Sequence, residues 1–305
     1  MEKHRKKLIK NAAVFDGHSG GLAQGKKIVI EDDIVTEITA DEVSEENFDE
    51  VFDGTGMVAM PGMTDAHVHM GCLFAKGEFP VDYATVPTVT KCKDALMAGF
   101  TTFRDAGSVS EGLKLAFDEG VLPGPRIYPC GAYISQTCGH GDSEYAHTYR
   151  DIQYRHPSSA VLADGVPEII RAVREQFYRG ASHIKLMATE ILNRHEDIRL
   201  LFGTDMMITG PDYQVEQSED IRYYEKRFGT MRALRALTGT ANEVFALTTY
   251  QNPYPKGKIG VLEAGSYADL LLVDGDPTKS VSVLADTDHL RLIMKGGTVY
   301  KNTLC

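Results

Sequence analysis

The chain has 305 residues, enough for one large domain or two moderate ones with a sizeable buried core. Acidic side chains outnumber basic ones by 43 to 32, and the net charge of −11 argues against binding to nucleic acid or to an anionic membrane surface. No apolar run suits a membrane span, the basic N-terminus lacks the apolar segment of a secretory signal, and the five cysteines contain no CxxC motif, so we expect a cytoplasmic protein with reduced thiols.

Short strands are predicted at both ends of the chain. In the first part, apolar runs separated by Gly, Asp and Pro turns predict strands at 7–15, 27–31, 34–38 and 56–60. The last part has the same pattern, with strands predicted at 260–262, 268–274 and 290–300, where the last run turns back at Gly296-Gly297. This arrangement indicates a composite β-sandwich domain made from residues 1–62 and 257–305.

Strands and helices alternate in the middle, residues 63–256. Strands are predicted at 64–70, 101–105, 127–134, 183–188 and 199–205, and helices at 86–98, 112–119, 167–179 and 223–237. This alternation indicates an α/β fold with a parallel sheet, and polar residues at the strand ends indicate a site of the TIM-barrel type. About five βα units are present, whereas a closed barrel of this type needs eight.

Two histidines follow the turn at Pro61-Gly62, in the sequence Asp65-Ala66-His67-Val68-His69. Side chains two residues apart on a strand point to the same side, about 6.6 Å apart along the chain. His67 and His69 can therefore bind one metal ion, with zinc–nitrogen distances of about 2.0–2.1 Å. The alternative is two unrelated histidines on a surface strand, and the motif alone does not decide between them.

Lys185 lies in the apolar sequence HIKLMA, where burying an unpaired lysine is costly. A free ammonium is a poor metal ligand, but a lysine carboxylated by carbon dioxide is anionic and can bridge two cations. The alternative is a lysine whose amine reaches solvent at the end of the barrel. His183 lies two residues earlier on the same face, and we interpret it as a packing residue or a hydrogen-bond donor.

Three further polar positions follow predicted strands. Asp205 ends the run RLLFGTD, where a carboxylate is a metal ligand, a general base or both, with a helix N-cap as the alternative. His140, in the sequence GHGD, is a candidate for binding a substrate carbonyl or carboxylate, and a polar turn is the alternative. Arg104 and Asp105 close the second strand, and we interpret them as a structural ion pair.

Taken together, these motifs resemble the amidohydrolase superfamily. The resemblance rests on MPGMTDAHVHM, IKLMAT, LLFGTD and the ending GKIGVLEAGSYADLLLVDGDP, and SQTCGHGD is similar to the branch of imidazolonepropionase-like enzymes, Xaa-Pro dipeptidases and ochratoxinase-type amidases. It implies a binuclear Zn²⁺ site in which His67 and His69 bind the first metal and Lys185 bridges as a carbamate. Asp205 would complete the first metal site and act as the catalytic base. The implied activity is hydrolysis of an amide or peptide bond in a small substrate, such as an N-acyl amino acid or an Xaa-Pro dipeptide, by metal-activated water.

The resemblance also implies two histidines on the fifth and sixth barrel strands that hold the second metal. Only twenty positions separate Lys185 from Asp205, and His195, the one histidine between them, lies in a predicted helix. We therefore predict that about three βα units are missing near 189–190, through a splice form, a deletion or a faulty gene model, which leaves one or two zinc ions. Unpaired sheet edges favour homo-oligomers. The alternative to a working hydrolase is a catalytically impaired remnant with a scaffold or oligomer-forming role.

Overall fold

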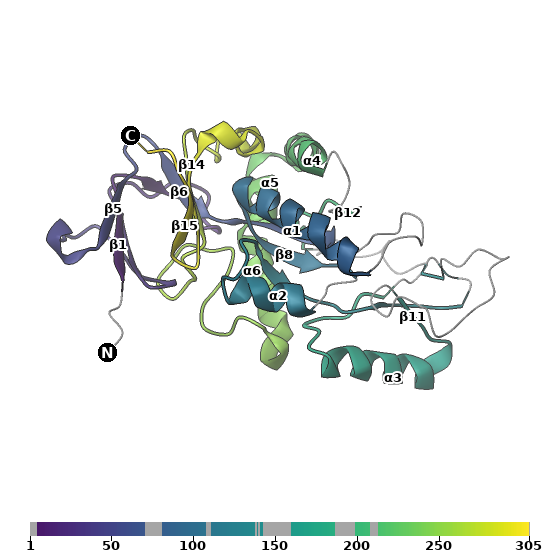
Figure 1. Cartoon of the computed structure of the whole chain (residues 1–305). Coiled ribbons are helices and arrows are strands. Elements are labelled where there is room, and N and C mark those ends of the chain that lie inside the picture. The colour runs from purple at the N-terminus through teal and green to yellow at the C-terminus, as the bar shows by residue number, and fades with distance from the viewer. Residues whose placement is uncertain are drawn as a thin grey trace.

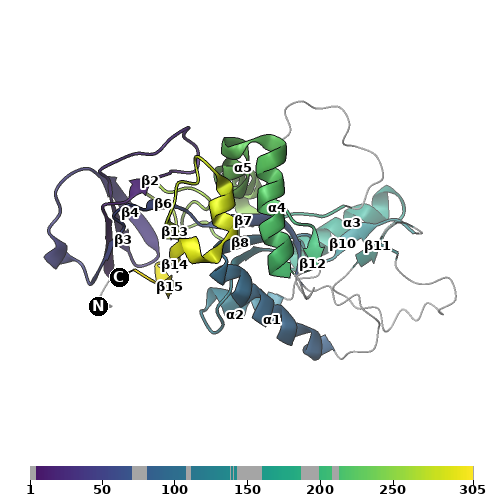
Figure 2. The same cartoon turned by 90° about the horizontal axis from the view of Figure 1, so that it is seen from above.

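The computed structural model describes residues 5–70, 81–107, 111–137, 139, 141–142, 160–186, 199–207 and 213–304. Strands nearest to the two termini, β1 (Lys6–Lys10) and β15 (Thr298–Asn302), lie at one end of the molecule, and helix α3 (Gly165–Tyr178) lies at the other (Figures 1 and 2). Between them lies a parallel sheet covered by helices. Among the described helices, none is long and apolar enough to cross a membrane.

The first sheet consists only of N-terminal strands, in the order β4-β3-β1-β5. Its other members are β3 (Lys27–Glu31), β4 (Ile34–Thr39) and β5 (Glu50–Asp53). In β3 the residues Ile28 and Ile30 are fully buried while their neighbours are partly exposed, which is the two-residue alternation of a strand with one covered face. Only β5 was not predicted, because the sequence EVFD carries two acidic residues in four.

The second sheet joins both ends of the chain, in the order β15-β14-β13-β6-β2. Its other strands are β2 (Ala13–Val14), β6 (Val58–Pro61), β13 (Leu270–Val273) and β14 (Leu290–Lys295). β6 pairs with β13 in antiparallel register, so that Met60 lies opposite Leu271. Leu270 and Leu272 pack with the first sheet, whereas Leu271 and Val273 pack with the central part of the molecule. Because both faces are covered, β13 is apolar at every position.

The central sheet is parallel, in the order β12-β7-β8-β9. It consists of β7 (Met63–His69), β8 (Phe100–Asp105), β9 (Arg126–Tyr128) and β12 (Met206–Met207), and a separate parallel pair consists of β10 (Tyr133–Ser135) and β11 (Ala160–Leu162). Helix α1 (Val81–Met97) packs against β8, α2 (Glu111–Asp118) against β9, and α5 (Thr230–Leu237) against β7. The strands assigned in the described residues form open sheets rather than a closed ring.

Further helices lie between the central sheet and the C-terminal strands, between those C-terminal strands, and, for one short helix, between β4 and β5. They are α4 (Tyr213–Phe228), α6 (Gly239–Phe245) and the short 3-10 helices η1 (Glu45–Asn47), η2 (Ala246–Gln251), η3 (Val281–Ala285) and η4 (Thr287–His289). The helix predicted at 223–237 is two helices, because Gly229 adopts a φ of 82° that ends α4 before α5 begins. The strand predicted at 260–262 was wrong: these residues are not in a strand.

Candidate metal centre

Strand β7 places His67 and His69 on the same side, as the two-residue spacing predicted. The two imidazole rings lie 5.5 Å apart, and each Nε2 atom approaches the same carboxylate oxygen, Oδ1 of Asp205. The distances to that oxygen are 2.9 Å from His67 and 3.3 Å from His69. These three side chains form a group of potential metal ligands whose donor atoms lie within 4.8 Å of one another.

Asp205 reaches this position from a segment that sequence reasoning assigned wrongly to a strand. Residues 199–205 are not in a strand, and the two-residue β12 follows them. Two backbone bonds hold the segment beside β7, from Ala66 N–H to the Phe202 carbonyl and from Asp205 N–H to the His67 carbonyl. At Gly203 a Cβ atom would lie 2.7 Å from Cβ of His67, so only glycine permits this close approach. Asp205 itself has a φ of 54°, a left-handed conformation that aspartate tolerates better than most residues.

Lys185 joins the same group from a third element. Its Nζ atom lies 2.9 Å from Nε2 of His67, and its carbonyl accepts the N–H of Ile134 in β10. The strand predicted at 183–188 is reduced to a single parallel bridge between Leu186 and Ile134 within the described residues. Desolvation lowers the pKa of Lys185, and the Asp205 carboxylate partly opposes that shift.

The donor atoms around His67 fit a bound cation better than they fit one another. Nε2 of His67 lies 2.9 Å from both Lys185 Nζ and Asp205 Oδ1, but one nitrogen cannot accept from an ammonium and donate to a carboxylate at the same time. Ligands of a tetrahedral zinc ion at about 2.0–2.1 Å lie roughly 3.3 Å from each other. The separations of 2.9 Å and 3.3 Å to Asp205 are close to this value. Two imidazoles and a carboxylate are also the donor types that zinc prefers.

Asp65 holds together the two segments that carry His67 and Asp205, and it was not predicted as a site residue from the sequence. Its carboxylate is fully buried and accepts the N–H of His67, the N–H and hydroxyl of Thr204, and the side-chain amide of Gln217. Desolvation raises the pKa of Asp65 to about 7. Asp65 therefore ties β7 to the Asp205 segment. The only sequence signal for this role was the position of Asp65, two residues before His67 at the start of the motif Asp65-Ala66-His67-Val68-His69.

The residues around His183 differ in part from their predicted roles. Its Nε2–H donates to the Asp105 carbonyl at 3.0 Å, and its Nδ1 lies 3.0 Å from the Ser182 hydroxyl, which agrees with the hydrogen-bond donor expected there. The predicted ion pair of Arg104 with Asp105 is not a close contact: within the described residues no carboxylate oxygen lies within 4.0 Å of the Arg104 guanidinium, and the Asp105 charge acts on it from farther away. The Arg104 guanidinium instead donates to the Ala66 carbonyl, and the Asp105 carboxylate accepts the N–H groups of Met70 and Gly107. Adjacent side chains of a strand point to opposite faces, which explains the difference.

Two of the histidines considered from sequence, His140 and His195, lie outside the described residues, as do Thr189 and Glu190. Within the described part of the chain, one group of three or more potential metal ligands occurs, namely His67, His69 and Asp205. The side chain of His67 is 35% exposed and that of Asp205 is 72% exposed, so a small molecule can reach this group from solvent.

Comparison with known proteins places these residues in a family. The model of the amidohydrolase family matches residues 58–199, a range that contains His67, His69 and Lys185. Ochratoxinase from Aspergillus niger is 36% identical over 152 residues, which is 43% of this chain and 31% of that enzyme. A 5-methylthioadenosine/S-adenosylhomocysteine deaminase from Dictyoglomus turgidum is 36% identical over 70 residues, 23% of this chain and 16% of that enzyme. The chain thus matches about a third or less of the length of these relatives.

Solved structures agree with this placement over nearly the whole chain. An amidohydrolase has a TM-score of 0.84 at 23% identity, covering 98% of this chain and 100% of that one. The A. niger ochratoxinase has a TM-score of 0.76 at 19% identity, covering 99% and 96%, and an Xaa-Pro dipeptidase with bound methionine has 0.69 at 20%, covering 97% and 100%. At these identities the likeness concerns the fold. The chain therefore carries a domain of the amidohydrolase family, matched over residues 58–199.

Proposed function

We propose that this protein hydrolyses an amide or peptide bond of a small substrate by metal-activated water, with zinc held by His67, His69 and Asp205. The observation that carries the proposal is the approach of both Nε2 atoms to one oxygen of Asp205, at 2.9 Å and 3.3 Å. The names of the relatives support the reaction type: an ochratoxinase is similar in sequence, and an Xaa-Pro dipeptidase is similar in fold. N-acyl amino acids and Xaa-Pro dipeptides are therefore the substrates to test first.

The roles of the side chains follow from their positions. His67 and His69 hold the metal through Nε2, and Asp65 fixes the orientation of β7 beneath them through the His67 N–H. When bound, a divalent cation polarises the scissile carbonyl and makes water acidic enough to attack near neutral pH. Asp205, whose side chain is largely exposed, accepts the proton of the attacking water and delivers it to the leaving amine. Lys185 forms a carbamate: its amine nitrogen bonds to the carbon of CO₂ and loses one proton to solvent.

The architecture that we propose for this function is an incomplete TIM-type barrel over residues 63–256, shortened near 189–190. It is joined to a composite β-sandwich of residues 1–62 and 257–305. The parallel order of β12, β7, β8 and β9 supports the first part, and the pairing of β6 with β13 supports the second. A shortened barrel also leaves sheet edges that favour homo-oligomers.

A second candidate function is a catalytically impaired remnant that keeps the scaffold. One observation favours it: the described residues offer ligands for one ion, and both ring nitrogens of His183 are already engaged. A binuclear hydrolase needs further ligands for its second cation, and with one cation the carbamate of Lys185 loses part of its stabilisation. We therefore expect turnover well below that of a chain with the missing block restored.

The test measures zinc and turnover on the same preparation. The protein is expressed with zinc and bicarbonate, zinc per chain is determined by mass spectrometry, and hydrolysis is assayed on a panel of N-acyl amino acids and Xaa-Pro dipeptides. We expect Asp205→Ala to lose bound zinc and to lower kcat/KM by about 10²–10⁴-fold, the usual contribution of a positioned base. Asp288→Ala is the matched control, because Asp288 is exposed and is not one of the candidate metal ligands.

The outcomes separate the two candidates. Zinc with measurable turnover that depends on Asp205 supports the hydrolase. Zinc without turnover on any substrate supports the impaired remnant. A wild-type protein that binds no zinc, or turnover unchanged in Asp205→Ala, would show that both readings of the group are mistaken.

A further inference from the structure

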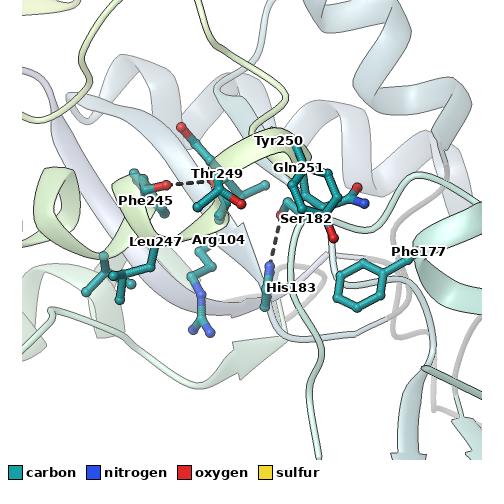
Figure 3. A pocket seen from close by; sticks show the side chains of 12 residues that line it. Arg104, Phe177, Ser182, His183, Phe245, Leu247, Thr249, Tyr250 and Gln251 are labelled. Carbon is teal, nitrogen blue, oxygen red and sulfur yellow. Dashed lines mark hydrogen bonds between the residues drawn. The ribbon is translucent and has the colours of Figure 1, made fainter. Parts of the chain in front are cut away.

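A cavity of 390 Å³ lies between the segment 244–251 and the central strands, and it contains none of the four residues of the candidate metal centre. Arg104 from β8, Tyr128 from β9 and Phe177 from α3 contribute to its wall, and Phe245 and Leu247 line it from the other side. Its volume is within the range of roughly 300–1,000 Å³ that is typical of small-molecule sites. In Figure 3 the Arg104 and His183 side chains extend in the same direction, Arg104 from β8 and His183 from a segment that is not in a strand.

Arg104 gives this cavity a positive charge that its lining does not neutralise. The lining residues include no aspartate or glutamate. In the described part of the chain, no carboxylate oxygen lies within 4.0 Å of the guanidinium, the charge of Asp105 acts on it from farther away, and it donates a hydrogen bond to the Ala66 carbonyl at 3.2 Å. A guanidinium has five N–H donors in a fork that fits a carboxylate. A desolvated cation with spare donors favours an anionic ligand.

Part of the cavity wall is aromatic and apolar. Tyr128 and Phe245 are stacked with their ring centroids 3.8 Å apart, and both are almost completely buried, at 1% and 3% exposure. Leu247 is 64% exposed at the rim. An exposed apolar rim above a buried aromatic floor suits a flat, apolar group more than a hydrated one. The cavity thus combines one charge with an aromatic and apolar part of its wall, and the rest of the wall is polar, from Ser182, His183, Thr248, Thr249 and Gln251.

The backbone of the lining segment is strained at one residue. Thr249 has a φ of 48° and a ψ of −120°, a conformation that a β-branched residue rarely adopts. The adjacent Thr248 hydroxyl donates to the Phe245 carbonyl at 2.6 Å and helps to hold the turn. Such strain persists only where surrounding contacts impose it, and it is concentrated at ligand-binding segments. This observation is independent of the charge of Arg104.

From these features we propose that the cavity is a binding site for a small aromatic carboxylate, whose carboxylate pairs with the Arg104 guanidinium and whose ring lies against Phe245 and Leu247. The site shares no residue with the candidate metal centre, although the charge of Arg104 acts on His67 and Lys185. Its occupancy therefore does not require zinc, and the proposal stands or fails independently of the proposed hydrolysis.

The full chain is first treated with EDTA to remove metal. It is then titrated in a calorimeter with two carboxylates, benzoate and phenylacetate, and with their neutral analogues, benzamide and phenylacetamide. We expect the carboxylates to bind and the amides to bind at least tenfold more weakly. Arg104→Gln should weaken carboxylate binding at least tenfold. Arg171→Gln, which removes an exposed arginine from α3, should leave it unchanged. Equal affinity for acid and amide would overturn the proposal.

A pair of rim variants keeps the test decisive if Arg104→Gln does not fold. Because Leu247 is largely exposed, both Leu247→Asp and Leu247→Lys should fold. The aspartate should weaken benzoate binding several-fold by repulsion, and the lysine should preserve or strengthen it. The absence of a heat of binding when wild-type protein is titrated to about 10 mM benzoate, a concentration that nearly saturates a site with a Kd of about 1 mM, would refute the site. Binding that appears only with added zinc, or disappears in Asp205→Asn, would place the carboxylate at the metal centre instead.

Discussion

Replacing Asp269 by alanine should destabilise the protein more than any surface change. Asp269 precedes β13, and its carboxylate accepts two hydrogen bonds from the guanidinium of Arg126 in β9, at 2.7 Å and 3.2 Å. The two side chains are 3% and 10% exposed, so Asp269→Ala leaves a buried guanidinium without its counter-charge. The N–H of Gly296, which donates to the same carboxylate at 2.6 Å, loses its acceptor as well. Breaking a buried pair in this way costs about 3–5 kcal/mol, a large fraction of a typical stability of about 5–15 kcal/mol.

The assay is urea unfolding followed by far-ultraviolet circular dichroism, because the chain has no tryptophan. Glu243→Ala is the matched control: the pair of Glu243 with Arg199 is about half-exposed on both sides, at 54% and 52%. Such pairs contribute less than about 1 kcal/mol. If Asp269→Ala lowered the free energy of unfolding by no more than Glu243→Ala does, burial of the Arg126–Asp269 pair would not be what makes its loss costly. That result would refute the prediction.

Three further results are expected. Desolvation lowers the pKa of Lys295 to about 8 from 10.5, so the folded state binds fewer protons than the unfolded state between these two values. The free energy of unfolding should therefore rise by about 2 kcal/mol from roughly pH 7.5 to 9.5. In pH-dependent unfolding, Lys295→Met should lose this rise, whereas Lys301→Met should keep it. Phe202→Ala removes a fully buried ring and should lower the free energy of unfolding by about 3–5 kcal/mol in the same urea assay. A loss below about 1 kcal/mol, as expected for an exposed side chain, would contradict the place of Phe202 in the core. Gly203→Ala should displace His67 and weaken zinc binding by at least about tenfold in a competition titration with a chelator. Gly112→Ala, where an added Cβ meets no atom within 4 Å, should leave zinc binding unchanged. Equal zinc affinity in the two variants would contradict the close packing of Gly203 on His67.

The parts of the fold that the sequence predicts well are those where a local pattern decides the structure. Ile28, Val29 and Ile30 form an apolar run between Lys27 and Glu31 and lie in β3. His67 and His69 keep the two-residue spacing that puts both rings beside one carboxylate. The sequence also predicted that Asp205 lies beside the two histidines, although it did not predict the backbone conformation of that segment. A carboxylate at the end of an apolar run indicates a site whatever the exact conformation of that run.

The parts that could not be predicted depend on contacts distant in sequence. The run containing Phe202 reads as a strand because it is apolar, but the close packing of Gly203 on His67 and the left-handed Asp205 prevent regular strand geometry. The role of Asp65 depends on Thr204, 139 positions later, and no local pattern links the two. The charge of Arg104 was paired with the adjacent Asp105 because they are neighbours in sequence, whereas side chains of adjacent strand residues diverge.

The pairing of β6 with β13 also affects how the chain must be made. Met60 pairs with Leu271, so 211 further residues must be synthesised before this partner exists. At a translation rate of about 5–20 residues per second, the wait is roughly 10–40 s. During that time Val58–Pro61, which becomes a buried strand between two apolar layers, has neither its partner strand nor its covering layers. The nascent chain therefore exposes this apolar segment on the ribosome until residue 271 has been made, and a chaperone that binds apolar segments can shield it during that time.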